Sequence, residues 1–257
     1  MIDPLYTLSG AVVGLVVGLT GVGGGSLMTP LLVLVFGVHP STAVGTDLLY
    51  AALTKGAGTL VHRSRDNVDW RVVRLLASGS VPAAAATLFG MSRTGLSSAD
   101  VSRFIGAALG VALLLTSLSI LFRPWLLRVR SKRPPMAPVR LAWTTFAVGA
   151  VLGVLVSASS VGAGALGVTV LLMLYPAAPV VRIVGTDIAH AVPLTFVAGA
   201  GHWLIGSVDL MMLASLLLGS IPGIVLGSRL ASGADERFLR VLLSVVLVFV
   251  GIKLLLA

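Results

Sequence analysis

The chain has 257 residues, of which 57% are hydrophobic and 11% are charged, and its formal net charge is +9. Its mean hydropathy of +1.06 lies far from the balance of roughly half apolar and one quarter charged residues in soluble domains. These totals exclude a soluble globular domain and indicate an integral membrane protein. The apolar runs are near the roughly 20 residues that cross a bilayer as helix and do not alternate like barrel strands, so we expect helices.

The same totals exclude several classes of function. The chain contains no cysteine and only four scattered histidines, so we expect no disulfide, no metal site and no cofactor. The net positive charge does not predict nucleic-acid binding, because Lys and Arg in a membrane protein mainly report which side of the membrane a loop faces.

The first part of the chain opens with two short apolar stretches, at about 5–19 and 27–36, on either side of the glycine-rich sequence TGVGGGS at 20–26. Each stretch is too short to span comfortably. They therefore predict a re-entrant hairpin or two short tilted crossings, and one long interrupted helix is the least favoured alternative. Three longer stretches follow, which we expect to be spanning helices, at about 42–61, 75–91 and 101–122.

The second part of the chain repeats the first. A shift of about 140 residues aligns TGVGGGSL with SSVGAGAL, AVGTDLL with IVGTDIA, NVDW with SVDL, and GSVP with GSIP. Four matches in the same order indicate a duplication. The predicted repeats are residues 1–122 and 141–257, and a basic, proline-rich linker at 123–140 joins them.

Charge predicts the direction of each repeat. The loop at 62–74 contains four arginines, whereas the equivalent loop at 202–214 contains no Lys or Arg. By the positive-inside rule these loops face opposite sides, so the repeats should have inverted topology, with the basic loops cytoplasmic and both termini periplasmic. The predicted fold is an all-α integral membrane protein of two inverted repeats. Each repeat would hold a Gly-broken pair of short helices or a re-entrant hairpin plus about three spanning helices.

The glycine-rich segments are the first candidate site. Irregular backbone within a bilayer is tolerated only where protein or a wet cavity satisfies its polar groups. A half-helix beginning at Ser26 would aim free N–H groups and the positive end of its dipole into such a cavity, which suits an anion. Helix packing through small residues is the alternative interpretation. The predicted anion-binding residues in these segments are Gly23, Gly24, Gly25, Ser26, Gly162, Ala163, Gly164 and Ala165.

Two buried carboxylates follow Gly-Thr pairs. Ionisable groups within apolar spans are costly unless paired or hydrated, which makes Asp47 and Asp187 candidates for function. A protonated carboxyl group could donate to the anion and release its proton later, which would couple transport to protons. Capping of the broken helices is the alternative role. The neighbouring Thr46 and Thr186 could bind an oxyanion or a coupling ion.

Three further polar residues lie in or beside the predicted spans. Lys55 could neutralise a bound anion, or its stem could carry the ammonium group to an interface. His190 shares a helical face with Asp187 and could relay protons, or could be a hydrogen-bonded packing histidine. His202, next to Trp203, is expected in a loop or at the membrane interface.

The pattern GLTGVGGGSLMTPLL, followed by AVGTDL and a second VGTD, resembles the TauE/SafE sulfite-exporter family of bacterial membrane permeases over essentially the whole chain. The second glycine segment departs from the pattern, because Ala163, Ala165 and Thr169 stand where the first has Gly24, Ser26 and Pro30. The resemblance implies movement of sulfite, sulfonates, sulfoacetate-like molecules or carboxylates across the inner membrane.

The predicted function is therefore a secondary transporter of small anions that works by alternating access, with proton or sodium coupling. An anion channel is the alternative. An intramembrane hydrolase lacks a nucleophile with an evident base, so no enzymatic activity is expected, and a purely structural protein leaves the buried aspartates unexplained. The expected partners are the anion and the lipid bilayer, and the pattern does not decide whether the chain forms a homodimer.

Overall fold

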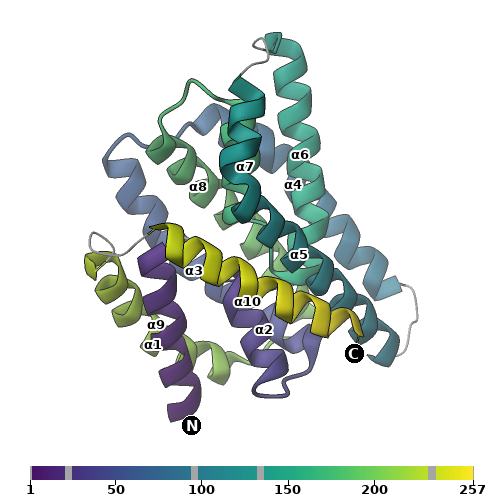
Figure 1. Ribbon diagram of the computed structural model, residues 1–257. Coiled ribbons are helices and arrows are strands. Elements are labelled where there is room, and N and C mark those ends of the chain that lie inside the picture. Colours follow the sequence, from purple (N-terminus) through teal and green to yellow (C-terminus); the bar gives the residue numbers. More distant parts are fainter. Residues whose placement is uncertain (1, 21–24, 94–97, 132–135, 231–235, 257) are drawn as a thin grey trace.

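The computed structural model describes residues 2–20, 25–93, 98–131, 136–230 and 236–256, and within these ranges every regular element is an α-helix. The all-α class predicted from the sequence is confirmed. In chain order the helices are α1 (Pro4–Thr20), α2 (Gly25–Leu34), α3 (Pro40–Ser64), α4 (Trp70–Arg93), α5 (Ser98–Ser131), α6 (Pro138–Ser159), α7 (Ala165–Leu174), α8 (Val180–Leu204), α9 (Leu210–Leu230) and α10 (Glu236–Leu256) (Figure 1).

Within the described ranges, five helices are long and apolar enough to cross a membrane, namely α4, α5, α6, α8 and α9. The helices α1, α2 and α7 are shorter apolar helices, as expected for the segments next to the glycine-rich sequences. Helix α3 has 25 residues but carries Asp47 and Lys55 within its length, which lowers its hydropathy. These features are those of an integral membrane protein.

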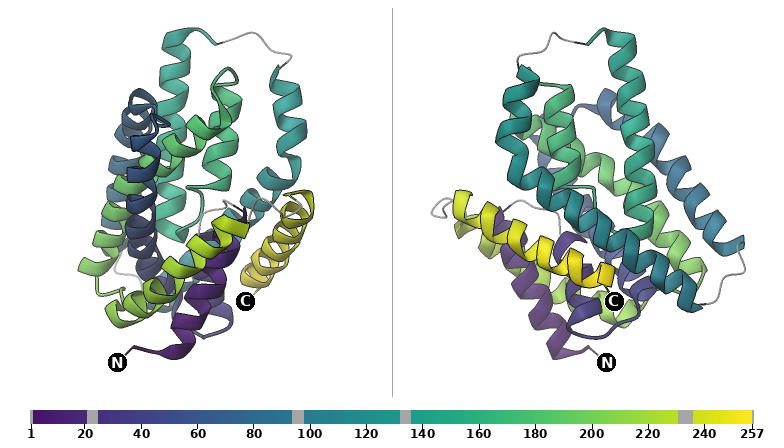
Figure 2. Two further views of the ribbon diagram at one scale, coloured as in Figure 1. Left: turned by 90° about the vertical axis from the view of Figure 1, so that its left-hand side faces the viewer. Right: turned by 45° about the vertical axis from the view of Figure 1, so that its right-hand side comes forward.

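The helices pack in pairs that match across the two parts of the chain. Helix α1 packs along α9, helix α6 packs along α4, and α3 packs against α8. In Figure 1 the α1–α9 pair lies at the lower left and the α4–α6 pair at the upper right. Helices α5 and α10 also pack together and run diagonally across one side of the bundle (Figure 2). Under the sequence shift α1 corresponds to α6 and α4 to α9, so equivalent helices make equivalent contacts.

Small residues allow the helices of the α1–α9 pair and of the α4–α6 pair to approach each other closely. A methyl group at Gly14 of α1 would lie 2.9 Å from the Cα of Ser220 in α9, and one at Gly153 of α6 would lie 2.8 Å from the Cα of Ser80 in α4. Contacts this close require residues without side chains, as in other membrane helix pairs.

The central helices α3 and α8 run antiparallel. Near the start of α3, Gly45 faces His202 at the end of α8, and near the end of α3, His62 faces Gly185 at the start of α8. These two helices carry the two Gly-Thr-Asp sequences, so the sequences lie toward opposite ends of the bundle.

Helix α5 extends through residues 123–131, which the sequence assigned to the linker at 123–140. No helix-breaking pair of residues occurs before Pro134 and Pro135, so the helix continues. Pro124 lies inside α5, and the helix bends along its length (Figure 2), as expected where proline removes a backbone hydrogen bond.

Candidate functional site

Each glycine-rich segment lies between the end of one described helix and the start of the next. Helix α1 ends at Thr20 and α2 begins at Gly25, while α6 ends at Ser159 and α7 begins at Ala165. The predicted anion-binding residues Gly23 and Gly24 lie outside the residues that the structure describes.

The second interruption has a defined backbone path. Ser160 adopts a left-handed conformation with φ 59°, and it ends α6 by donating its backbone N–H to the carbonyl oxygen of Val156. Gly162 and Gly164 follow with φ of 130° and 136°. Side chains rarely tolerate such φ values, so glycine is required at both positions.

The two interruptions meet inside the protein. Gly25 packs against the backbone carbonyl group of Ser160, and a methyl group at Gly25 would lie 3.1 Å from the Ser160 Oγ. Gly25 and Ser26 are both buried. The start of α2 therefore contacts the break between α6 and α7, which is the arrangement that the repeat predicted for a shared site.

Asp47 joins these segments through its carboxyl group. Its Oδ2 accepts a hydrogen bond of 2.5 Å from Thr29 Oγ1 in α2 and one of 2.9 Å from Ser160 Oγ. The side chain is fully buried, and its Oδ1 has no hydrogen-bond partner among the described residues. Asp47 in α3 thus holds α2 and the second interruption together and keeps one oxygen available.

Asp187 occupies the equivalent position in α8 but has different surroundings. It is also buried, and neither of its carboxyl oxygens has a hydrogen-bond partner among the described residues. The group packs against Gly167 in α7, and the backbone N–H of Gly164 lies near it without forming a hydrogen bond. Thr169, which is equivalent to Thr29 at the shift that pairs Asp47 with Asp187, donates its hydroxyl to the carbonyl oxygen of Ala165 instead.

Lys55 lies between the two carboxylates. Its Nζ donates a hydrogen bond of 2.8 Å to the carbonyl oxygen of Ala163 in the second interruption. The ammonium group interacts electrostatically with Asp187 and, more weakly, with Asp47, although the residues described show no salt bridge between them. Its charge is therefore directed into the protein at the interruption.

Thr46 and Thr186 each contact a loop in the other half of the chain. Thr46 Oγ1 accepts a hydrogen bond of 3.0 Å from the backbone N–H of Asp209, and Thr186 Oγ1 accepts one of 2.9 Å from the backbone N–H of Asp69. We call these two interactions the reciprocal loop contacts. The Asp69 loop also forms an ion pair of 3.9 Å with Arg182, between side chains that are 46% and 39% exposed. The two threonine hydroxyls are thus engaged at opposite ends of the bundle in this conformation.

Two further hydrogen bonds connect the repeats. His190 Nε2 lies 2.9 Å from Ser80 Oγ in α4, and Tyr50 hydrogen-bonds to Ser220 in α9. Tyr50 is the sequence equivalent of His190, and the two serines are equivalent in the GSVP and GSIP motifs. Sequence reasoning missed Tyr50 and both serines, although the repeat alignment already paired these positions.

The expectation for His202 was wrong. This residue lies in the last turn of α8, is fully buried, and its Nε2 lies 2.9 Å from the carbonyl oxygen of Ser157. The neighbouring Trp203 is 56% exposed, in agreement with an interfacial position. Helical periodicity explains the difference, because adjacent residues point to different faces.

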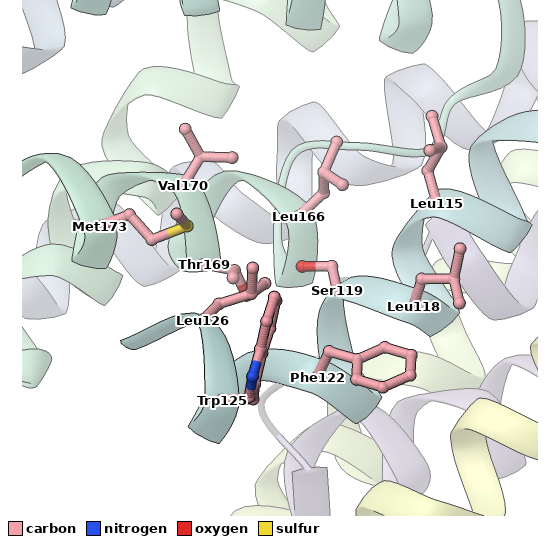
Figure 3. Close-up of a pocket in the computed structure, with 10 residues that line it drawn as sticks. All are labelled: Leu115, Leu118, Ser119, Phe122, Trp125, Leu126, Leu166, Thr169, Val170 and Met173. Carbon is pink, nitrogen blue, oxygen red and sulfur yellow. The ribbon is translucent and has the colours of Figure 1, made fainter. Parts of the chain in front are cut away.

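A cavity of about 390 Å³ lies between α5 and α7. Figure 3 shows that its walls are mainly leucine and aromatic side chains around Ser119. No charged side chain lines it, so it offers no counter-charge for an anion. The candidate site is instead the buried group of Asp47, Lys55, Asp187 and the two helix interruptions.

Helices interrupted around buried ionisable side chains occur in membrane transporters, and the comparisons with known proteins agree with that broader class. The chain belongs to the sulfite exporter TauE/SafE family, whose model matches residues 6–254. The family resemblance inferred from the motifs is confirmed.

Individual relatives carry the same description. The chain is 39% identical over 250 residues to the probable membrane transporter protein YjnA of Bacillus subtilis (strain 168), covering 96% of this chain and 98% of the relative. It is 28% identical over 218 residues to the probable membrane transporter protein YdhB of the same organism, covering 84% and 85%. A probable membrane transporter protein of Xylella fastidiosa (strain 9a5c) is 25% identical over 258 residues, covering 95% and 91%. No solved structure gives a significant match.

Proposed function

We propose that this protein is a secondary transporter that moves small sulfur-containing or organic anions across the bacterial inner membrane. Sulfite, sulfonates, sulfoacetate-like molecules and carboxylates are the substrate classes. The contact between the two helix interruptions, with Lys55 directed at one of them, is the observation that carries this proposal. It supplies a positive side chain and the N-termini of α2 and α7 at one buried place, and each of these attracts an anion.

The proposal includes inverted topology for the repeats. Repeat-equivalent helices α3 and α8 run antiparallel, and the α1–α9 and α6–α4 pairs make equivalent contacts. Both observations support a two-fold relation between halves of opposite orientation. The arginine-rich loop at 62–74 would face the cytoplasm, and both termini would face the periplasm.

The anion would bind among Gly25, Ser26, Lys55 and the segment 162–165, with Gly23 and Gly24 completing the first interruption. Asp47, Asp187 and His190 would carry the coupling proton or sodium ion. Alternating access would follow from the reciprocal loop contacts, because one lies at each end of the bundle. Opening one contact would release Thr46 or Thr186 to an entering oxyanion on that side only.

A transport assay tests the proposal. Purified protein in liposomes would be supplied with sulfite, methanesulfonate, sulfoacetate or acetate, and uptake would be measured with and without unlabelled anion inside. A carrier shows saturation and counterflow, whereas a channel conducts without exchange. Absence of both activities for every anion would contradict the proposal.

The matched variants are Lys55→Met and Thr195→Val. Thr195 is the sequence equivalent of Lys55, and its hydroxyl bonds only to carbonyl oxygens of its own helix, Ala191 at 2.8 Å and Val192 at 3.5 Å. Removing the lysine charge should abolish anion uptake, since no other Lys or Arg is placed at the interruptions among the described residues. Removing the threonine hydroxyl should leave uptake close to that of the unmodified protein. Equal uptake by both variants would refute the role of Lys55.

A further inference from the structure

The buried site has a charge imbalance that anion transport must overcome. Asp47 and Asp187 bring two carboxyl groups and Lys55 brings one ammonium group. With all three ionised, the site carries a net charge of −1 before any anion enters. A buried uncompensated charge is strongly unfavourable, and a second negative charge would increase the cost. A positive charge must therefore enter together with the anion.

The hydrogen bonds show which carboxyl group stays ionised. Asp47 accepts two hydroxyl hydrogen bonds on one oxygen, from Thr29 and Ser160, and bonds of this kind favour a carboxylate. Asp187 has no such donor among the described residues. The partner threonines differ, because Thr169, the equivalent of Thr29 at the shift that pairs Asp47 with Asp187, donates its hydroxyl to the carbonyl oxygen of Ala165.

Among the charged groups around Asp187, one can compensate the negative charge of its carboxylate. From α3 it faces Lys55, and His62 of α3 lies beside Gly185 near the start of α8. On its own helix, His190 lies one turn further on and hydrogen-bonds to Ser80, while Arg182 pairs with Asp69 outside the site. Helix α7 carries no titratable side chain, and the titratable residues of α4 and α6 lie in their terminal turns, at Arg71, Arg74, Arg93 and Arg140. Lys55 is thus the group that balances Asp187.

We infer that anion binding and proton binding are coupled through Lys55, with Asp187 as the proton site. This inference rests on the proposed anion transport. A bound anion draws the ammonium group of Lys55 to itself, which leaves the Asp187 carboxylate without compensation. Asp187 then takes up one proton on a carboxyl oxygen, and the net charge of the site stays the same for a monovalent anion. When the anion leaves, Lys55 returns to the carbonyl oxygen of Ala163, where its charge again compensates Asp187, and the proton is released.

Calorimetric titration counts these protons directly. The full-length protein in detergent would be titrated with methanesulfonate in two buffers of different ionisation enthalpy. This monovalent ligand does not change its charge near neutral pH, so any proton taken up binds to the protein. We expect about one proton per anion, and hence an affinity that falls about tenfold per unit of pH over the range in which the free protein has released this proton and the anion complex still holds it.

Asp187→Asn and Asp47→Asn are the matched variants, because the two residues occupy equivalent positions. Asparagine resembles the protonated carboxyl group, so Asp187→Asn should still bind the anion, with no proton uptake and no dependence on pH. In liposomes it should retain counterflow but lose accumulation driven by a proton gradient. Asp47→Asn should still take up about one proton wherever it binds the anion.

The outcomes separate this inference from the proposed function. Wild-type protein that binds an anion without proton uptake would overturn the inference alone, and a requirement for sodium in that case would identify the other coupling ion. Proton uptake that persists in Asp187→Asn, or a folded Asp187→Asn that binds no anion, would also overturn it. Wild-type protein that neither binds nor transports any of the anions would contradict the proposed function itself.

Discussion

Replacing Gly25 by alanine should disassemble the site while the protein remains in the membrane. The added methyl group would meet the backbone carbonyl oxygen of Ser160, which cannot move aside by side-chain rotation. Overpacking of this kind costs about 1–3 kcal/mol. If Ser160 shifts to relieve the contact, its hydrogen bond to Asp47 is lost as well, and a hydrogen bond to a charged group contributes about 1.5–3 kcal/mol.

The smaller of these two free-energy costs is enough to predict a loss of transport. A change of about 1 kcal/mol lowers the ratio of assembled to disassembled sites about fivefold. Anion uptake into liposomes should therefore fall for Gly25→Ala. Gly106→Ala in α5 is the control, because a methyl group there has nothing within 4 Å, and alanine in a helix should add about 0.5–1 kcal/mol of stability. Uptake by Gly25→Ala at the wild-type rate, with equal protein in the membrane, would refute the close contact.

Three further predictions concern the ends of the bundle. Thr186→Val leaves the backbone N–H of Asp69 without its acceptor and should destabilise the protein by about 1–3 kcal/mol, seen as a lower melting temperature in detergent; an unchanged melting temperature would contradict the contact. Arg182→Gln removes only the exposed ion pair with Asp69, so its melting temperature should stay close to that of the wild type, and a loss as large as that of Thr186→Val would show that the ion pair dominates. A single cysteine at Arg71 should react with an impermeant thiol reagent from the cytoplasmic side and one at Met211 from the periplasmic side, since the chain has no other cysteine; the reverse labelling would invert the topology.

The hydrophobic stretches and the internal repeat of the sequence predicted much of the fold. Helix α3 begins at Pro40 and α8 begins directly after Pro179, and α2 begins at Gly25, one residue before the predicted Ser26. Proline sets the backbone angle at a helix start and glycine permits the break, so both signals are local. The predicted linker at 123–140 was too long because a single proline, Pro124, bends a membrane helix without ending it.

The contacts within the site could not be predicted in the same way. The hydrogen-bond partners of Asp47 are 18 and 113 residues away in the chain, and no local pattern places Thr29 and Ser160 on one oxygen. The reciprocal loop contacts were missed for the same reason. The motif alignment shows that Thr46 and Thr186 are equivalent, but it does not show that each one bonds to the other repeat.

The reciprocal loop contacts also bear on how the chain is made. While the first repeat is in the membrane and the second is still on the ribosome, Thr46 has no Asp209 to bind and the Asp69 loop has no Thr186. Neither repeat can therefore complete its own packing, and biogenesis must protect an unfinished half until synthesis ends. Cutting the gene within 132–135 and expressing both fragments in one cell should yield a reassembled carrier, whereas either fragment alone should be degraded.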